Sequence, residues 1–415
     1  MNAVDRLFAL EKFGIKLGLD NIRALLAALG NPEQAWPSIH IGGTNGKGSV
    51  AAMVERALRA SGLHTGRYTS PHLDRIEERV AIDGVPVDGA TFDSVTGDVF
   101  AVVDELMRGG TLTVTPTFFE VSTAVAFEIF RRQHVEVGVV EVGLGGRFDA
   151  TNVLTPRIAA ITSIALDHER HLGRTLPEIA FEKAGIAKPG VPLVVGHVPR
   201  EAEARIAKVA AEVGAPIVDA HATTTDRKYP PLTLALPGRH QLENAAVAVA
   251  ILEKWSAMVS HVSTDAIVTG LTSCEWPARL EWLRLPRGGE VLIDAAHNPA
   301  GAAALASYLQ DTRSPKLPIV FAAMADKDVA GMIKALEPVA SMFVATAVPH
   351  PRARPAGEMA AEIRKHAAPV HVIAAATPEA AVSRALEHAP KVVAAGSIYM
   401  VGPLRARLVE AGAVH

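Results

Sequence analysis

Cysteine is almost absent from this chain. Cys274 is the single cysteine among 415 residues, so the sequence excludes an internal disulfide and a cysteine-ligated metal cluster. The net charge is also small, −3 at pH 7, and gives no electrostatic reason to expect a nucleic acid or an anionic membrane surface as partner. No apolar run reaches the roughly eighteen residues that a membrane span needs. We expect a soluble, cytoplasmic protein that acts on small molecules.

The rest of the composition is that of an ordinary globular protein. Hydrophobic residues make up 49% of the chain, enough for two or three domains with full cores. Short apolar runs alternate with helical patterns, which predicts an α/β fold of parallel sheets covered by helices on both faces. The expected strands of a first series are 135–142, 158–166 and 192–196, and the expected helices include 119–131 and 176–187.

A Pro/Gly-rich stretch interrupts this pattern at residues 283–289. It is the best linker signal in the chain, and we expect two α/β domains, 1–284 and 285–415, to meet there. A second alternating series follows, with expected strands at 291–295, 318–323, 342–347, 370–374 and 392–395. Ligands of such sheets bind at the carboxyl ends of strands and in clefts between domains.

A glycine-rich run lies between the apolar segment 39–41 and a helical pattern. It reads Gly43-Thr44-Asn45-Gly46-Lys47-Gly48-Ser49. Such a turn between a strand and a helix aims several backbone N–H groups at one point, where a polyphosphate binds. The common P-loop pattern requires Gly at position 41, where Ile stands, and Ser or Thr at position 48. We interpret the run as a variant nucleotide-binding loop, with a plain glycine turn as the alternative.

Side chains that could hold a metal follow two of the expected strands. Glu141 ends the strand 135–142, and Asp167 and His168 follow the strand 158–166. A carboxylate beside phosphates suits Mg²⁺, which prefers few carboxylates and hard oxygen donors. Glu141 is therefore a candidate metal ligand, unless it caps the glycine turn after it. His168 alone is typical of a hydrogen-bonded loop histidine. It follows the strand next to that of Glu141, at the corresponding position, and is therefore a second candidate metal ligand.

Three further segments are ambiguous when each is considered alone. Lys183, next to a glutamate, is typical of a solvated helix face, and the segment 70–72 (Ser-Pro-His) is typical of a turn. Residues 117–120 (Thr-Phe-Phe-Glu) fit a capping box at the start of a helix. Their aromatic side chains fit a pocket for a flat ring equally well.

Polar residues also follow the first strand of the second series. Capping of the next helix explains Asn298 and the proline after it. Capping does not explain Asp294 or His297, which we expect to face the crevice at the strand end. Arg279 precedes the expected linker, where it either reaches a phosphate from the domain boundary or forms a surface ion pair.

These segments together resemble the folylpolyglutamate synthase/dihydrofolate synthase family, the folate branch of the Mur ligase superfamily. Peptidoglycan Mur ligases usually have Thr where Gly48 stands and carry a UDP-sugar-binding domain before the loop. Because 42 residues precede Gly43, we expect that domain to be absent. The resemblance implies a P-loop, parallel-sheet ATPase domain of Mur ligase type and a C-terminal Rossmann-like domain. The matching segments are collinear: 43–49, 70–72, 117–120, 141–152, 166–168, 182–186, 236–244, 276–281 and 294–299.

The resemblance also implies a role for each matching position. The residues implied to bind ATP are Thr44, Asn45, Gly46, Lys47, Gly48, Ser49, Asn244, Arg279 and Asp294. Those implied to ligate Mg²⁺ are Ser70, Glu141 and His168, and those implied to line the pterin pocket are Phe119 and Asp149. Lys183 matches a lysine that is carbamylated in the family, where the carbamate holds a second Mg²⁺. His297 is implied to assist the attacking amine or to organise the cleft, and the alternatives stay open.

The implied reaction is ATP-dependent ligation of L-glutamate to dihydropteroate and to reduced folates. The substrate carboxylate attacks the γ-phosphate of ATP, and the glutamate amine then displaces phosphate from the acyl phosphate. We expect both activities in a monomeric enzyme with no nucleic-acid or membrane partner. The alternatives are a folylpolyglutamate synthase alone, a peptidoglycan amino-acid ligase, and a P-loop kinase or regulator without a ligation step.

Overall fold

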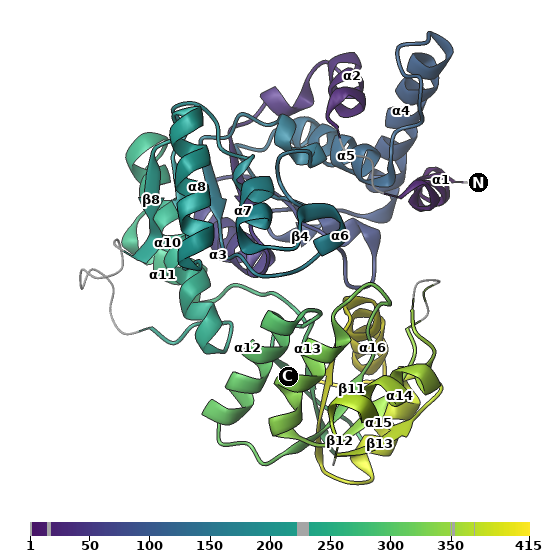
Figure 1. The fold of residues 1–415 in the computed structure, drawn as a ribbon. Coiled ribbons are helices and arrows are strands. Elements are labelled where there is room, and N and C mark those ends of the chain that lie inside the picture. Colours follow the sequence, from purple (N-terminus) through teal and green to yellow (C-terminus); the bar gives the residue numbers. More distant parts are fainter. Residues whose placement is uncertain (1, 15–17, 222–231, 349, 351–352, 369) are drawn as a thin grey trace. The chain divides into compact units, whose positions relative to one another are not determined.

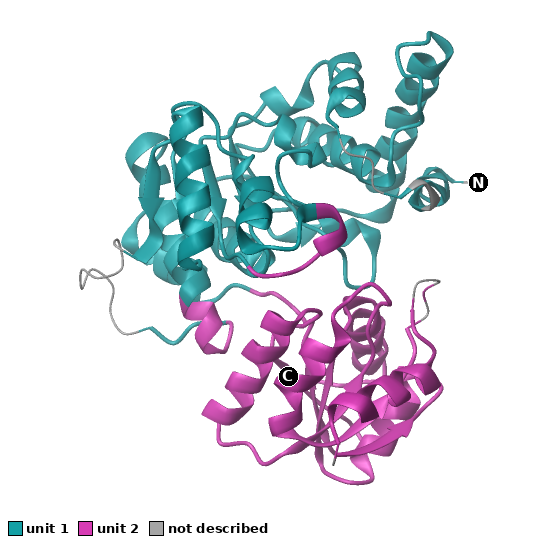
Figure 2. Ribbon diagram, in the orientation of Figure 1, with its two compact units in different colours: residues 1–164, 172–235, 243–274 teal, residues 165–171, 236–242, 275–415 magenta. Residues whose placement is uncertain are grey.

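The computed structural model describes residues 2–14, 18–221, 232–348, 350, 353–368 and 370–415 (Figure 1). The chain divides into two compact units (Figure 2). Each unit is built on a mostly parallel sheet, which confirms the predicted α/β class. Unit 1 comprises Met1–Ile164, Leu172–Ala235 and Glu243–Cys274, and unit 2 comprises Ala165–His171, Leu236–Leu242 and Glu275–His415.

The sheet of unit 1 has eight strands in the order β4-β3-β2-β5-β1-β6-β7-β8. β3 pairs antiparallel with β2 and β4, and the other neighbours are parallel. The central strands are buried along their whole length, as Val- and Ile-rich strands covered on both faces must be. Their bounds are β1 Ser38–Gly42, β2 Thr65–Tyr68, β3 Val80–Ile82, β4 Val85–Pro86, β5 Val137–Glu141, β6 Ile158–Ile161, β7 Leu193–Val195 and β8 Ile217–Asp219.

Helices cover this sheet on both faces (Figure 1). α3 packs against β1, β2 and β5 and against α11, while α7 packs against α8. The α-helices of unit 1 are α1 Ala3–Phe8, α2 Asp20–Ala28, α3 Lys47–Ala60, α4 Gly89–Arg108, α5 Phe118–Arg132, α7 Leu176–Ala184, α8 Arg200–Val213 and α11 Thr264–Thr272. α10, Arg239–Met258, begins in unit 2 and continues in unit 1. Short 3-10 helices lie at Ala9–Phe13, Pro32–Gln34, Ile76–Arg79, Ala150–Val153 and, in unit 2, Glu337–Val339.

The sheet of unit 2 has six strands in the order β13-β12-β11-β14-β10-β9, and only β9 runs antiparallel to its neighbour. The strands are β9 Glu281–Arg284, β10 Glu290–Ile293, β11 Leu317–Phe321, β12 Ala340–Ala345, β13 His371–Ala374 and β14 Lys391–Ala395. The helices are α12 Pro299–Asp311, α13 Val329–Leu336, α14 Ala356–His366, α15 Pro378–Leu386 and α16 Ile398–Glu410. The short helix α6, Glu169–Leu172, begins in unit 2 and ends at the first residue of the return to unit 1. Each strand predicted for the second series overlaps one of β10 to β14.

Two predictions about local structure are wrong. The strand predicted to end at residue 166 is β6, which ends at Ile161, so Asp167 and His168 follow a loop. Residues 283–289 are not a linker, because Leu283 and Arg284 belong to β9 and the turn after them leads back into β10. A Pro/Gly-rich turn between paired strands has the same composition as a linker between domains. The limits 1–284 and 285–415 stay a prediction about functional domains.

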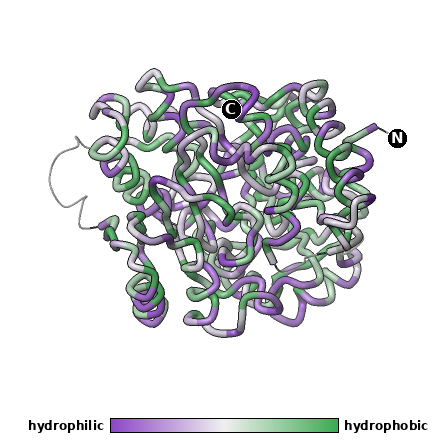
Figure 3. Tube along the Cα trace, turned by 90° about the horizontal axis from the view of Figure 1, so that it is seen from above, coloured by the Kyte–Doolittle hydropathy of each residue, from purple (hydrophilic) through white to green (hydrophobic). Residues whose placement is uncertain are grey.

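No helix in the described ranges is long and apolar enough to cross a membrane. Hydrophilic and hydrophobic residues are interspersed along the chain (Figure 3). This pattern is that of helices with one face on a sheet and one face in water.

Packing against Trp36 predicts the effect of a methyl group at Gly138 in β5. A Cβ added there would lie 2.4 Å from Trp36 Cζ3, and Trp36 is itself packed edge-on against Phe127 and Phe130. Gly138→Ala should therefore destabilise the protein by about 1–3 kcal/mol, measured as a lower midpoint of urea unfolding.

Gly97 in α4 provides a matched control, because a Cβ there meets only Ala3 Cβ at 3.9 Å. Gly97→Ala should raise the free energy of unfolding by up to about 1 kcal/mol, because alanine has the higher helix propensity, and the urea midpoint should rise with it. Equal shifts in the two variants would contradict the packing at Gly138.

Candidate active site

The glycine-rich run forms the predicted loop between a strand and a helix. β1 ends at Gly42, and α3 begins at Lys47 after Gly46 in the left-handed region (φ 86°). Gly43 has φ 137°, and a Cβ on it would lie 2.0 Å from Thr162 Oγ1. Only glycine fits this close approach. The loop therefore delivers its N–H groups and the start of a fourteen-residue helix to one point.

The segment after β6 holds the loop in place. Thr44 N donates to Ser163 O at 2.8 Å, and Asn45 N donates to Ser163 Oγ at 3.0 Å. Thr162 Oγ1 donates to Asn45 O at 2.6 Å. Sequence reasoning missed Thr162 and Ser163; the signal was a pair of hydroxyl residues directly after a buried strand.

Lys47 lies beside the predicted metal ligand Glu141. Its Nζ is 3.1 Å from Thr44 O and 3.9 Å from Glu141 Oε1. Ser70 N donates to Glu141 Oε2 at 3.1 Å. The structure thus brings an ammonium group, a buried carboxylate and a serine together at the carboxyl ends of β1, β2 and β5.

Lys183 is not on a solvated helix face. The side chain is buried, 5% exposed, and its Nζ donates to Gly43 O at 2.9 Å, across 140 residues of sequence. Its neighbour Glu182 instead pairs with Arg147 at 2.7 Å. The amine of Lys183 therefore lies directly behind the glycine loop.

Asn244, from α10, also lies against the loop. A Cβ on Gly46 would be 2.1 Å from Asn244 Oδ1, so glycine at this position makes room for the amide. The structure groups Asn244 with the loop, and its implied contact with ATP stays a prediction.

The two predicted pterin-binding residues border a second glycine turn. The capping box of Thr117 and Glu120 starts α5 as predicted. It places Phe119 over Gly143, where an added Cβ would be 2.3 Å from Phe119 Cζ. Asp149 Oδ2 accepts a hydrogen bond from the backbone N–H of Leu144, the residue after Gly143, at 2.8 Å. Burial raises the pKa of Asp149.

In unit 2, Asp294 follows β10 and holds the turn that carries Arg279. Its Oδ2 accepts from Leu280 N and its Oδ1 from Ala296 N, both at 2.9 Å. Burial raises the pKa of Asp294, while the charge of Arg279 acts in the opposite direction. Ala278 and Leu280, on either side of Arg279, have φ of 58° and 51°. Left-handed backbone at two such residues is strained, and strain of this kind clusters at functional sites.

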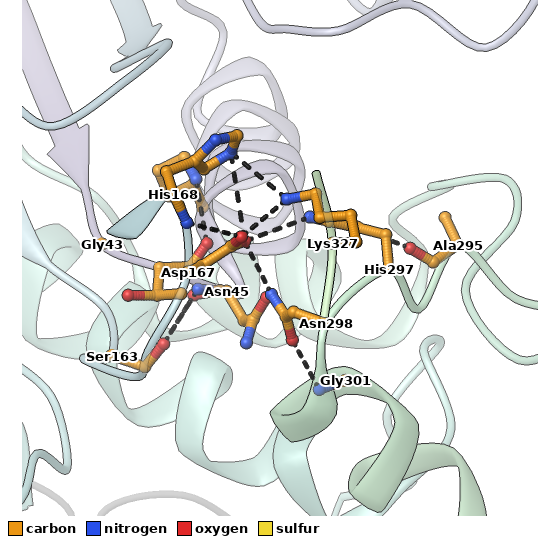
Figure 4. A network of polar contacts seen from close by, with 12 residues as sticks. Gly43, Asn45, Ser163, Asp167, His168, Ala295, His297, Asn298, Gly301 and Lys327 are labelled. Atoms are coloured by element: carbon orange, nitrogen blue, oxygen red, sulfur yellow. Dashed lines mark hydrogen bonds and ion pairs between the residues drawn. The ribbon is translucent and has the colours of Figure 1, made fainter. Parts of the chain in front are cut away.

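A second group of polar contacts centres on Asp167 (Figure 4). Lys327 Nζ lies 2.6 Å from Asp167 Oδ1 and 3.4 Å from His168 Nε2. Asn298 Nδ2 donates to Asp167 Oδ2 at 3.0 Å, and its Oδ1 caps α12 as predicted. The neighbouring cations hold the pKa of Asp167 below its usual range although burial acts against this. Sequence reasoning missed Lys327, whose signal was a charged segment, 326–328, separated by four residues from the end of β11.

The ring of His297 contacts the backbone of its own loop. Its Nδ1 lies 2.9 Å from the carbonyl oxygen of Ala295, which can only accept, so Nδ1 carries the proton and Nε2 has a free lone pair. Burial, followed by the charge of Lys327, lowers the pKa of His297 to about 4. Nε2 lies 3.7 Å from Asp167 Oδ2.

Known proteins are similar to this chain in sequence and in fold. Residues 278–398 match the family described as Mur ligase, glutamate ligase domain. The chain is 35% identical over 364 residues to the dihydrofolate synthase/folylpolyglutamate synthase of Bacillus subtilis, covering 82% of this chain and 84% of that protein. The chain belongs to the dihydrofolate synthase/folylpolyglutamate synthase family. A second relative, from Mycobacterium tuberculosis, is 38% identical over 367 residues, 81% of this chain and 75% of the relative.

Solved structures of this family cover nearly the whole chain. The folylpolyglutamate synthase of Mycobacterium tuberculosis complexed with ADP and AMPPCP superposes with a TM-score of 0.88 at 32% identity, over 98% of this chain and 99% of that one. E. coli FolC in complex with DHPP and ADP gives 0.86 at 29%, over 99% and 98%. The Yersinia pestis bifunctional enzyme complexed with AMPPNP and Mn gives 0.84 at 31%, over 99% and 98%.

The residues implied by the family divide between the two units. Ser70 and Glu141 belong to unit 1, and His168 belongs to unit 2. Within the described part of the chain, no group of three or more His, Cys, Asp or Glu side chains could hold a metal ion by itself. The donors present, one carboxylate and one hydroxyl group beside a phosphate-binding loop, fit Mg²⁺ that takes its remaining ligands from phosphates.

The Asp167–Lys327 pair predicts a large cost when its cation is removed. Both side chains are at most 10% exposed, so Lys327→Met leaves a buried carboxylate without its closest cation. We expect a loss of about 3–5 kcal/mol in the free energy of unfolding, measured by urea denaturation, and recovery of most of it in the double variant Asp167→Asn/Lys327→Met.

The exposed pair between Arg239 and Asp311 in the same unit is the control, with side chains 77% and 30% exposed. Arg239→Ala should cost less than about 1 kcal/mol. Similar losses from Lys327→Met and Arg239→Ala would contradict the buried pair.

Proposed function

We propose that the chain ligates L-glutamate to dihydropteroate and to reduced folates with ATP, releasing ADP and phosphate. The observation that carries the proposal is the glycine loop with Lys47 3.9 Å from Glu141, in a chain of this family. The relatives that bear the names of both activities support it, as do the solved complexes with ADP, AMPPNP, Mn and DHPP.

The loop binds the polyphosphate of ATP. The amino end of α3 faces the phosphates, and Lys47 neutralises charge on the transferring oxygens. Ser70, Glu141 and His168 hold Mg²⁺, which when bound neutralises phosphate charge. A second Mg²⁺ site beside Lys183 is part of the proposal.

The reaction has two covalent steps. A substrate carboxylate oxygen attacks the γ-phosphorus of ATP, the bond to the β–γ bridging oxygen breaks, and ADP leaves. The amine of glutamate then attacks the acyl carbon, and the bond to the phosphate oxygen breaks as the amide forms. The nitrogen loses a proton in this step, and the departing phosphate takes it up. The donors of the loop stabilise charge on the oxygens during the transfer.

His297 organises the cleft rather than removing a proton from the glutamate amine. A pKa of about 4 makes its imidazole too weak a base to deprotonate an ammonium group at neutral pH. Its unprotonated Nε2 is a hydrogen-bond acceptor. Of the two roles left open by the sequence, organisation of the cleft is therefore the better supported.

Asn244, Arg279 and Asp294 complete the ATP site in this proposal. In this proposal Asn244 contacts the adenine, and Arg279 binds phosphate charge. Asp294 fixes the turn of Arg279 through Leu280 N. The functional domains in this proposal are 1–284 and 285–415. We also propose that the enzyme is a cytoplasmic monomer; its single cysteine suits a reducing compartment.

ADP release with purified protein tests the proposed function. Dihydropteroate and tetrahydrofolate are each supplied with and without glutamate, and Lys47→Ala serves as the inactive control. We expect glutamate-dependent ADP release with both substrates. Activity on tetrahydrofolate alone would reduce the enzyme to a folylpolyglutamate synthase, and equal rates without glutamate would favour a kinase.

We further propose that Lys183 is carbamylated. The buried amine lies beside Gly43 O, and reaction with CO₂ converts it into an anion with oxygen donors for a cation. Lys183→Arg keeps the positive charge but cannot form a carbamate, so we expect at least a hundredfold loss of kcat, on the order of one lost electrostatic group. With ¹³CO₂, the wild-type protein should show a carbamate carbon signal by NMR that Lys183→Arg lacks. A fully active arginine variant would refute the assignment.

A further inference from the structure

A histidine lies in the middle of β1, at the centre of the larger sheet. His40 is completely buried, and its Nε2 is 2.8 Å from Thr151 Oγ1, across 111 residues of sequence. The same hydroxyl group is hydrogen-bonded to Asp149 Oδ1. The three side chains form a continuous chain of contacts inside unit 1, and all three are buried.

The contacts assign the protons in this chain. Asp149 accepts from Thr151 N at 3.0 Å and from Leu144 N at 2.8 Å, and donors to both oxygens favour the ionised carboxylate. The hydroxyl group of Thr151 therefore donates to Asp149, and its oxygen accepts from His40 Nε2–H. His40 Nδ1 is then unprotonated, and among the described residues it has no hydrogen-bond partner.

A buried imidazole with one unsatisfied nitrogen is costly. Burial, followed by the charge of Lys188, lowers the pKa of His40 to about 3, so the ring is neutral at pH 7. An aliphatic side chain would fill the same place without the unsatisfied acceptor. Packing therefore does not account for a histidine here, whereas the hydrogen bond to Thr151 does.

We infer that His40 and Thr151 are positioning residues that fix the carboxylate of Asp149 for recognition of the pterin ring of dihydropteroate. Asp149 Oδ1 takes two donors from Thr151, and Oδ2 is held by Leu144 N, so the carboxylate cannot rotate. A fused aminopyrimidine ring presents N–H donors, and an immobile carboxylate accepts them without losing side-chain freedom. The inference rests on the proposed function, because it takes dihydropteroate as the substrate and Asp149 as a residue that lines its pterin pocket.

Equilibrium titration of the full-length protein with dihydropteroate tests this inference, and the KM for ATP reports on the rest of the site. Thr151→Val removes the hydroxyl group and should weaken binding about tenfold, which corresponds to about 1.4 kcal/mol, while the KM for ATP changes less than about twofold. Thr151→Ser restores the donor and should bind as the wild type does. His40→Leu should weaken binding about threefold, and His40→Gln, which keeps an N–H donor, should restore it.

Thr96→Val is the matched control, because Thr96 is equally buried and donates only to Phe92 O within α4. It should leave dihydropteroate binding and the KM for ATP unchanged. If Thr151→Val does not fold, as judged by its thermal unfolding, His40→Leu and His40→Gln carry the test.

Wild-type binding in Thr151→Val or His40→Leu would overturn the inference. An equal rise in the dihydropteroate and ATP constants would overturn it too, since that result means a general structural defect. Failure of the proposed function looks different: the wild-type protein then shows no glutamate-dependent ADP release, whatever the variants bind. In an Asp149→Ala background, Thr151→Val should have no additional effect on binding, because its action passes through the carboxylate.

Discussion

The candidate site of unit 1 depends on how closely the backbone of Gly43 approaches its neighbours. Its Cα faces Thr162, where no side chain fits, and its carbonyl oxygen accepts from Lys183 Nζ. This contact fixes the glycine loop between the segment after β6 and α7. With the loop fixed, the amino end of α3 needs no rearrangement at the moment of binding, which is the advantage of a preorganised electrostatic site.

Unit 2 depends on a different constraint, the need to satisfy a buried carboxylate. Asp167 obtains an ammonium from Lys327 and an amide from Asn298, and both come from segments that follow strands of the second sheet. The positive charge of Lys327 in turn adds to the effect of burial and lowers the pKa of His297 further. A single ion pair therefore ties a short segment, 165–171, to the rest of unit 2 and also acts on a neighbouring histidine.

Both units place their polar side chains where parallel strands end. This arrangement follows from the sheet itself, because crossover helices return every parallel strand to the same edge. Glu141 after β5, Asp294 after β10 and Lys327 after β11 all lie at such ends. The side chains nearest to the reaction are thus carried by loops on a rigid scaffold.

The sequence by itself determined the fold class, the strand–loop–helix of the glycine run, the caps of α5 and α12, and the family. These features are encoded locally, in periodicity, in turn chemistry and in motifs of a few residues. The linker assignment at 283–289 failed for the same reason, since a local composition does not distinguish a hairpin from a domain boundary.

Only the tertiary structure decided which side chains are buried and which meet. Lys183 has the local sequence of a solvated face, yet it contacts Gly43 from 140 residues away. Lys327 contacts Asp167 across 160 residues of sequence, and His40 contacts Thr151 across 111. Contacts between residues so far apart in sequence depend on the order of strands in the sheet. Burial then holds a polar side chain in one hydrogen-bonded position. Neither the contacts nor the burial can be read from a single stretch of sequence.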